Sequence, residues 1–222
     1  MTIGKKIAFD AKPNRTDCYL RFSDAYVDID SAVTVGDPNS KIRIKTMFRV
    51  LQYHPSSPSA NRVFTVHNNS PWLSLDYASM TAAGGPYPNA LYFNIASSTY
   101  MGCSVLGDAV RVMQWFSVDA TYHAGHLTYS VDNLTADLHY DVDEHAAGQL
   151  TSMNGIQIGG ERRSGYYRGM YADLAYLDWW VDDDQTLSLR PSEKNALYDK
   201  VSMRDYYVSN GGTLEYRRMS ED

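Results

Sequence analysis

The sequence predicts an all-β protein, built as a two-sheet antiparallel sandwich with one short late helix. Short runs of alternating apolar and polar residues recur along the chain, turn residues separate them, and no helical crossovers for a parallel sheet are found. The length of 222 residues fits one sandwich domain, since such domains commonly reach about 200–250 residues. Tyrosine, with 18 copies against 6 Phe, favours the same class because its ring packs on a pleated surface while its hydroxyl reaches a polar partner.

The clearest strands lie between residues 115 and 141. Apolar residues occupy every second position of three runs, 116–122, 127–131 and 136–140, with polar residues between them. This period predicts strands with one buried face, joined by turns at residues 123–125 and 132–133. The polar positions should face one way across the three strands: Asp119, Thr121, His126, Thr128, Asp137, His139 and Asp141.

Further strands follow from the same signals of alternation and flanking turn residues. A long, mostly apolar strand near residues 170–181 is expected to be covered on both faces. The other expected strands cover residues 42–50, 62–67, 73–77, 90–96, 156–158 and 213–217.

One helix is expected over residues 191–203. Pro191 fixes φ at its start, Ser192 is a capping residue, and Glu193 suits the positive end of the helix dipole. We expect a single sandwich domain over residues 25–222, preceded by a segment, 1–24, that forms an extended arm or a first strand.

Charge and apolar content exclude two classes of partner. The net charge is −6, which disfavours nucleic acid because phosphates demand a basic patch. No apolar run approaches the roughly 18 residues of a membrane span, so no membrane insertion is expected.

The first residues lack the apolar core of a secretory signal, and we therefore expect synthesis in the cytoplasm. Cys18 and Cys103 allow either one disulfide or two free thiols.

A series of motifs in the second half of the chain occurs in the order found in one superfamily. Residues 115–122 read W-F-S-V-D-A-T-Y and are followed by L-T-Y-S-V-D-N at 127–133. Residues 156–160 then read I-Q-I-G-G, and 167–177 read Y-R-G-M-Y-A-D-L-A-Y-L. The phrase L-R-P-S-E-K-N-A-L-Y at 189–198 closes the series.

This series resembles the laminin-G-like, concanavalin A-like lectin/glucanase superfamily, over residues 26–198 when the earlier strands are included. The resemblance implies a jelly-roll sandwich, an architecture that does not by itself fix function. Ala172 and Ala175 stand where the family usually has an acid and a base, which weakens the transfer of a metal or ligand role to this strand. Asn133 replaces a glycine, a mild change because Asn tolerates left-handed backbone.

The sequence gives little support to catalysis. Glycoside hydrolysis needs two carboxylates about 5–10 Å apart, and none of the five Glu sits in the glucanase spacing Glu-x-Asp-x-x-Glu. Asp141 and Asp143 share a strand face but lie at a strand end. We therefore expect no enzymatic activity.

Candidate ligand-binding residues fall into three groups. Asp119, His126 and His139 belong to the polar face of the three-strand region, which suits hydrogen bonds to sugar hydroxyls. Exposed aromatic rings can stack on the apolar face of a sugar. The aromatic candidates are Tyr166, Tyr167, Trp180 and Trp72; calcium is the candidate ion for Asp182, Asp183 and Asp184.

Three functions remain open. The first is a non-catalytic carbohydrate-binding, lectin-like surface module, mounted on a virus particle. The second is a structural decoration or tail-associated virion protein that acts through contacts with surface proteins, with a homo-oligomer expected, since Tyr-rich surfaces suit subunit contacts. The third is a glycoside hydrolase or polysaccharide lyase.

Overall fold

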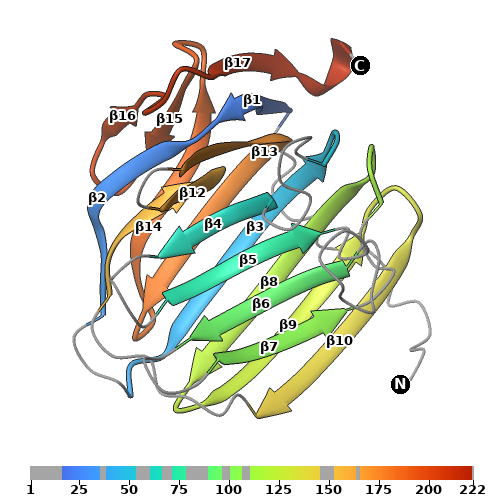
Figure 1. Cartoon of the computed structure of the whole chain (residues 1–222), viewed down its shortest axis with the longest axis vertical. Coiled ribbons are helices and arrows are strands. Elements are labelled where there is room, and N and C mark those ends of the chain that lie inside the picture. The colour runs from blue at the N-terminus through green and yellow to red at the C-terminus, as the bar shows by residue number, and fades with distance from the viewer. Residues whose placement is uncertain are drawn as a thin grey trace.

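The structure is a computed structural model that describes residues 17–35, 39–53, 61–66, 72–78, 90–96, 101–106, 111–145, 153–163 and 166–221. These residues form two antiparallel sheets (Figure 1). The main path of the larger sheet runs β10 (Leu138–His145), β9 (His126–Asn133), β8 (Trp115–His123), β3 (Ile42–Val50), β13 (Tyr166–Val181), β14 (Asp184–Ser192), β15 (Ala196–Asp199), β16 (Arg204–Tyr206). Beside this path, β1 (Cys18–Ala25) pairs with β13 and β17 (Thr213–Arg218), and β12 (Gly160–Arg163) pairs with β13.

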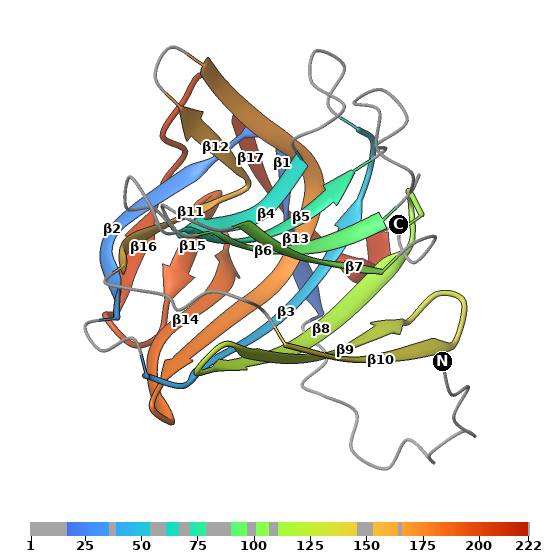
Figure 2. The same cartoon turned by 60° about the horizontal axis from the view of Figure 1, so that its bottom comes forward.

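The smaller sheet forms the second layer of the sandwich, and Figure 2 shows the two layers separated. Phe64 of the smaller sheet meets Trp179 of the larger edge-on at 5.7 Å between ring centroids, and Phe93 meets Tyr129 at 4.9 Å. The main core therefore lies between the sheets. The strands of the smaller sheet run in the order β2 (Val27–Val35), β11 (Met153–Ile158), β4 (Asn61–Val66), β5 (Trp72–Ala78), β6 (Ala90–Ala96), β7 (Met101–Leu106).

The three-strand region is the antiparallel meander that its sequence predicts. Burial alternates residue by residue along β8 and β9. Ala124 and Gly125 join them with φ values of 48° and 84°, the left-handed geometry of a two-residue hairpin turn. The second predicted turn is wrong, because Asp132 and Asn133 end strand β9 and residues 134–137 make the turn. Asp137 lies in that turn and not on the strand face.

The predicted helix is wrong. Residues 184–192 and 196–199 are paired strands. The one helical element in the described part of the chain is a 3-10 turn, η2 (Met219–Glu221). The Ser192 hydroxyl accepts the Lys194 N–H at 3.3 Å, so the cap holds a turn. Asn195 then takes a φ of 55°, which a helix cannot continue. Leu197 becomes buried through strand pairing, whereas Met203 stays 76% exposed.

Strand β13 is covered on both faces, as predicted, and this explains its continuous apolar sequence. Ala172 faces the main core. On the opposite face Ala175 belongs to a second, smaller cluster with Tyr19 and Tyr176, against which Met47, Trp115 and Met219 pack.

Within the N-terminal segment, β1 pairs with two strands of the larger sheet from Cys18 onward. Residues 1–16 are outside the described part, so an extended arm there stays a prediction. Cys18 is a free thiol. No helix in the described ranges is long and apolar enough to cross a membrane.

Candidate functional site

The outward side of β3, β8, β9 and β10 carries polar side chains, because the alternating apolar residues of these strands face the core. Strand pairing aligns them in rows across the sheet. One row joins Asp143, Thr128, Thr121 and Arg43, and ends at Trp180 on β13. We call this surface the outer face and define it by Arg43, Lys45, Asp119, Thr121, His126, Thr128, Ser130, Asp132, His139, Asp141 and Asp143.

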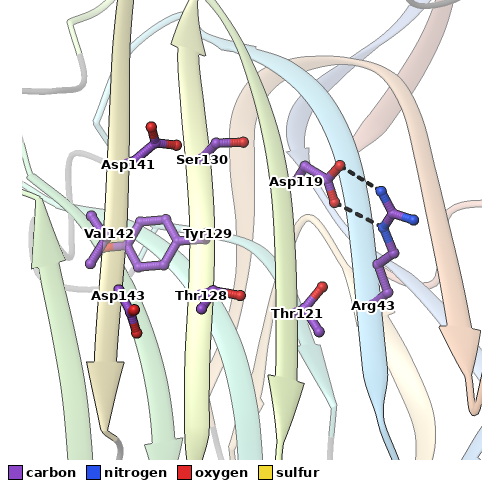
Figure 3. Close-up of a pocket in the computed structure, with 9 residues that line it drawn as sticks. All are labelled: Arg43, Asp119, Thr121, Thr128, Tyr129, Ser130, Asp141, Val142 and Asp143. Carbon is purple, nitrogen blue, oxygen red and sulfur yellow. Dashed lines mark hydrogen bonds and ion pairs between the residues drawn. The ribbon is translucent and has the colours of Figure 1, made fainter. Parts of the chain in front are cut away.

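The outer face contains an open depression with a volume of about 420 Å³. Figure 3 shows Arg43 reaching toward Asp119 on the neighbouring strand, with hydroxyl side chains of β8 and β9 beside them. Its lining consists of Arg43, Asp119, Thr121, Thr128, Tyr129, Ser130, Asp141, Val142 and Asp143.

Asp119 organises the β3–β8 side of the depression. The Arg43 guanidinium donates two hydrogen bonds to it, from Nε at 3.1 Å and Nη2 at 2.9 Å, and Lys45 Nζ lies 3.0 Å from Oδ2. Burial alone would raise the pKa of Asp119, but these hydrogen bonds outweigh it and lower the pKa. The same hydrogen bond raises the pKa of its cationic partner, Arg43. Asp119 is thus held as a carboxylate between two cations.

Histidines pair with carboxylates on the β9–β10 side. His139 Nδ1 lies 2.6 Å from Asp132 Oδ1, and its Nε2 lies 3.1 Å from Asp141 Oδ2. The hydrogen bond with Asp132 raises the pKa of His139; partial burial opposes this, and Asp141 adds to the rise. A second contact joins His126 Nε2 and Asp143 Oδ1. Each ring nitrogen donates a hydrogen bond only when it carries a proton.

The predicted polar residues Asp119, His126 and His139 therefore lie on one surface, and Asp119 lines the depression. Of the two adjacent indoles, Trp179 is buried in the core and Trp180 is partly exposed on the outward side of β13. The Arg43 guanidinium lies 5.8 Å from the Trp180 ring centroid. An aromatic surface thus borders the polar row.

The structure does not bring the other aromatic candidates to this surface. Tyr166 and Tyr167 begin β13, where they pair with Arg163 and Arg162 of β12. Trp72 begins β5 in the smaller sheet. The side chains of these three residues lie outside the described part, so their ligand role stays a prediction.

The three consecutive aspartates form a hairpin between β13 and β14. Asp182 and Asp183 have φ values of 52° and 70°, the left-handed conformation of a two-residue turn. Asp182 accepts hydrogen bonds from Ser40 Oγ at 2.9 Å and from the Lys41 N–H at 2.8 Å, and Asp183 pairs with Lys41 Nζ. Asp184 starts β14. These contacts give the aspartates a structural role, and no metal-ligand cluster of three His, Cys, Asp or Glu side chains occurs in the described ranges.

Sequence reasoning did not assign Arg43, Ser130 or Asp143 to the ligand-binding surface. The signal was present, because Arg43 and Lys45 alternate with buried Ile42 and Ile44. What the pattern lacks is strand order: β3 precedes β8 by some 65 residues, and only their pairing puts Arg43 beside Asp119.

The arrangement suits hydrogen bonding to a hydroxyl-rich ligand. The hydroxyls of Thr121, Thr128 and Ser130 both donate and accept hydrogen bonds, while Asp141 and Asp143 accept them. General acid catalysis requires a carboxyl that keeps its proton near the working pH. The lowered pKa of Asp119 makes it unsuited to that role.

Comparisons with known proteins identify the fold. The LG1-3 region of the laminin alpha2 chain superposes with a TM-score of 0.55 at 10% identity, over 91% of this chain and 35% of that chain. The enzymatically active domain of bacteriophage CBA120 tailspike protein 2 gives 0.50 at 9% identity, over 91% and 30%. Domains LG4-5 of the mouse laminin alpha1 chain give 0.49 at 14% identity, over 80% and 45%.

The first two of these likenesses confirm the resemblance at the level of fold: the chain is a concanavalin A-like jelly-roll sandwich. It spans less than half the length of each of these three solved chains. No protein-family model matches the sequence. No curated protein sequence matches it either.

Proposed function

We propose that the protein is a non-catalytic carbohydrate-binding module and that the outer face holds the glycan. The observation that carries the proposal is the open depression, where hydroxyl and carboxylate side chains from three neighbouring strands converge. Trp180 lies on β13, beyond β3, and contacts Arg43 of the lining. Glycan sites need many weak donors and acceptors fixed on a rigid surface, and sheet strands fix them better than loops. An indole adds an apolar surface for a sugar ring.

Electrostatic contacts hold the polar groups in place before any ligand binds. Asp119 fixes the Arg43 side chain through two hydrogen bonds, and Trp180 packs beside it. A side chain that is already ordered loses less conformational entropy on binding. This favours recognition of a ligand by the surface.

A glycan array with the purified protein, with calcium and again with chelator, tests the proposal. Binding that persists in chelator is expected, because the outer face binds through side chains alone. Thr121→Val with Thr128→Val should weaken the affinity for the glycan by about tenfold, because the change removes two hydrogen bonds of roughly 0.5–1.5 kcal/mol each. Thr213→Val, an exposed change on β17, is the matched control. A blank array, or equal binding by the double variant, contradicts the proposal.

A second function has support from a different surface. Val112, Met113, Leu134 and Leu138 are 42%, 59%, 37% and 48% exposed. They gather at one end of the meander, where the Leu134 N–H donates to the Trp115 carbonyl at 2.8 Å. Apolar side chains grouped on a surface favour protein contacts, in line with a virion decoration or tail-associated role. Light scattering and the protein's presence in purified particles test this alternative.

A further inference from the structure

The charges of the depression bear on which glycans it accepts. Its lining includes one basic side chain, Arg43, and three acidic ones, Asp119, Asp141 and Asp143. Lys45 adds a second cation beside it, but both cations contact the same carboxylate, Asp119. The positive charge on the β3 side is therefore already engaged within the protein.

The β10 side has a different balance. The side chains of Asp141 and Asp143 are 77% and 75% exposed, and the basic partners found for them are the histidines His139 and His126. Asp132 adds a third carboxylate beside His139. With neutral histidines, the outer face as a whole carries two cations and four carboxylates. Three of those carboxylates, Asp132, Asp141 and Asp143, lie on the β9–β10 side and both cations lie on β3, so the β9–β10 side is negative.

Resting on the proposed function, we infer that the outer face selects saccharides that carry no acid groups and rejects uronates and other anionic glycans. An anionic sugar laid across the strands meets Asp141 and Asp143 on one side. On the other side it must compete with Asp119 for Arg43. A neutral sugar meets hydroxyls and carboxylates as hydrogen-bond partners without either opposition, and an amine-bearing sugar meets attraction.

The histidines limit this selectivity to part of the pH range. Protonated His139, whose pKa is raised by its hydrogen bonds to Asp132 and Asp141, would add one positive charge and reduce the negative charge of the outer face. His123 lies opposite His126 in the β8–β9 register and adds a further titratable group at that end. Discrimination against anionic sugars is therefore expected to be larger at pH 8 than in acid.

The test compares matched hexasaccharides at pH 8 in low salt by calorimetric titration: neutral hexamers of glucose, mannose, galactose and N-acetylglucosamine, and a galacturonate hexamer with its methyl ester. The neutral glycan that binds is also compared with its carboxymethyl derivative. Anionic forms should bind at least about fivefold more weakly than their neutral partners, and salt should narrow the gap, because screening weakens the repulsion.

Asp141→Asn with Asp143→Asn should abolish most of that gap, because it removes the two charges that face the ligand. The readout is the ratio of neutral to anionic affinity within each protein, which a loss of binding common to both ligands does not change. Because both side chains are exposed, the variant should keep its melting temperature. Glu193→Gln, on the β14–β15 turn, is a control that removes one exposed carboxylate outside the outer face. Anionic forms that bind as tightly as neutral ones overturn the inference and leave the glycan-binding proposal standing. Absence of binding by every hexamer and by the array overturns both.

Discussion

Asp173 has no exposed surface, yet two arginines contact its carboxylate. Arg21 Nε lies 2.8 Å from Oδ1 and Arg49 Nε lies 2.8 Å from Oδ2. Arg49 also packs against the rings of Trp115 and Tyr19, at 4.8 and 5.3 Å from their centroids. The sequence shows Asp173 only as a polar interruption of an apolar strand. Its pairing could not be predicted, because β1 and β3 flank β13 through contacts more than 120 residues apart.

Asp173→Asn should therefore lower the free energy of unfolding by about 3 kcal/mol, since it leaves the charges of two packed arginines without their carboxylate. Urea unfolding measures this. The same change at Asp183, whose side chain is 76% exposed, should leave the free energy of unfolding nearly unchanged. Equal effects at the two positions would show that Asp173 is not a buried ionic centre.

His139 makes stability depend on pH in a defined direction. Hydrogen bonds to Asp132 and Asp141 raise its pKa above the ordinary value of 6.5, so the folded state binds the proton more tightly than the unfolded state. The stabilisation is complete below the unfolded pKa and is lost as pH rises through the folded pKa. Wild type should exceed His139→Gln in stability more at pH 5 than at pH 8. A constant difference between the two proteins would contradict the pairing.

Among the elements, the strands with strict alternation were predictable and the C-terminal hairpins were not. Strand β6 has the predicted bounds, and β3 matches over its whole length. The segment after Pro191 carries every local signal of a helix start, but the pairing of β14 with β15 buries Leu197 and Asp199. Local propensity lost to tertiary pairing, which a single sequence does not reveal.

Strand β13 passes so close to the end of β1 that it needs glycine. A Cβ on Gly169 would lie 2.0 Å from the carbonyl carbon of Asp24, and the Gly169 N–H donates to Asp24 Oδ1 at 3.1 Å. Gly169→Ala should destabilise the protein by about 2 kcal/mol or more. Gly211→Ala is the control, because its Cβ would meet nothing within 4 Å. Thermal unfolding of both variants decides, and a silent Gly169→Ala would refute this close approach.

For the whole molecule, the sandwich class follows from residue alternation, whereas the site depends on strand order. The meander residues Asp119, His126 and His139 could be grouped from sequence because tight turns join their strands. Arg43 and Trp180 reach the same surface through β3 and β13, which come from distant parts of the chain. The charge balance of the depression is thus a property of the assembled sheet.

The most direct measurement of the central claim is a map of backbone amide chemical shifts on titration with the glycan that the array identifies. The account predicts shifts concentrated on β3, β8, β9 and β10, accompanied by a shift of the Trp180 indole N–H on β13. In the Thr121→Val and Thr128→Val double variant, these shifts should be smaller at the same glycan concentration. Shifts confined to the β12–β13 hairpin around Tyr166 and Tyr167, or to the smaller sheet, would contradict it.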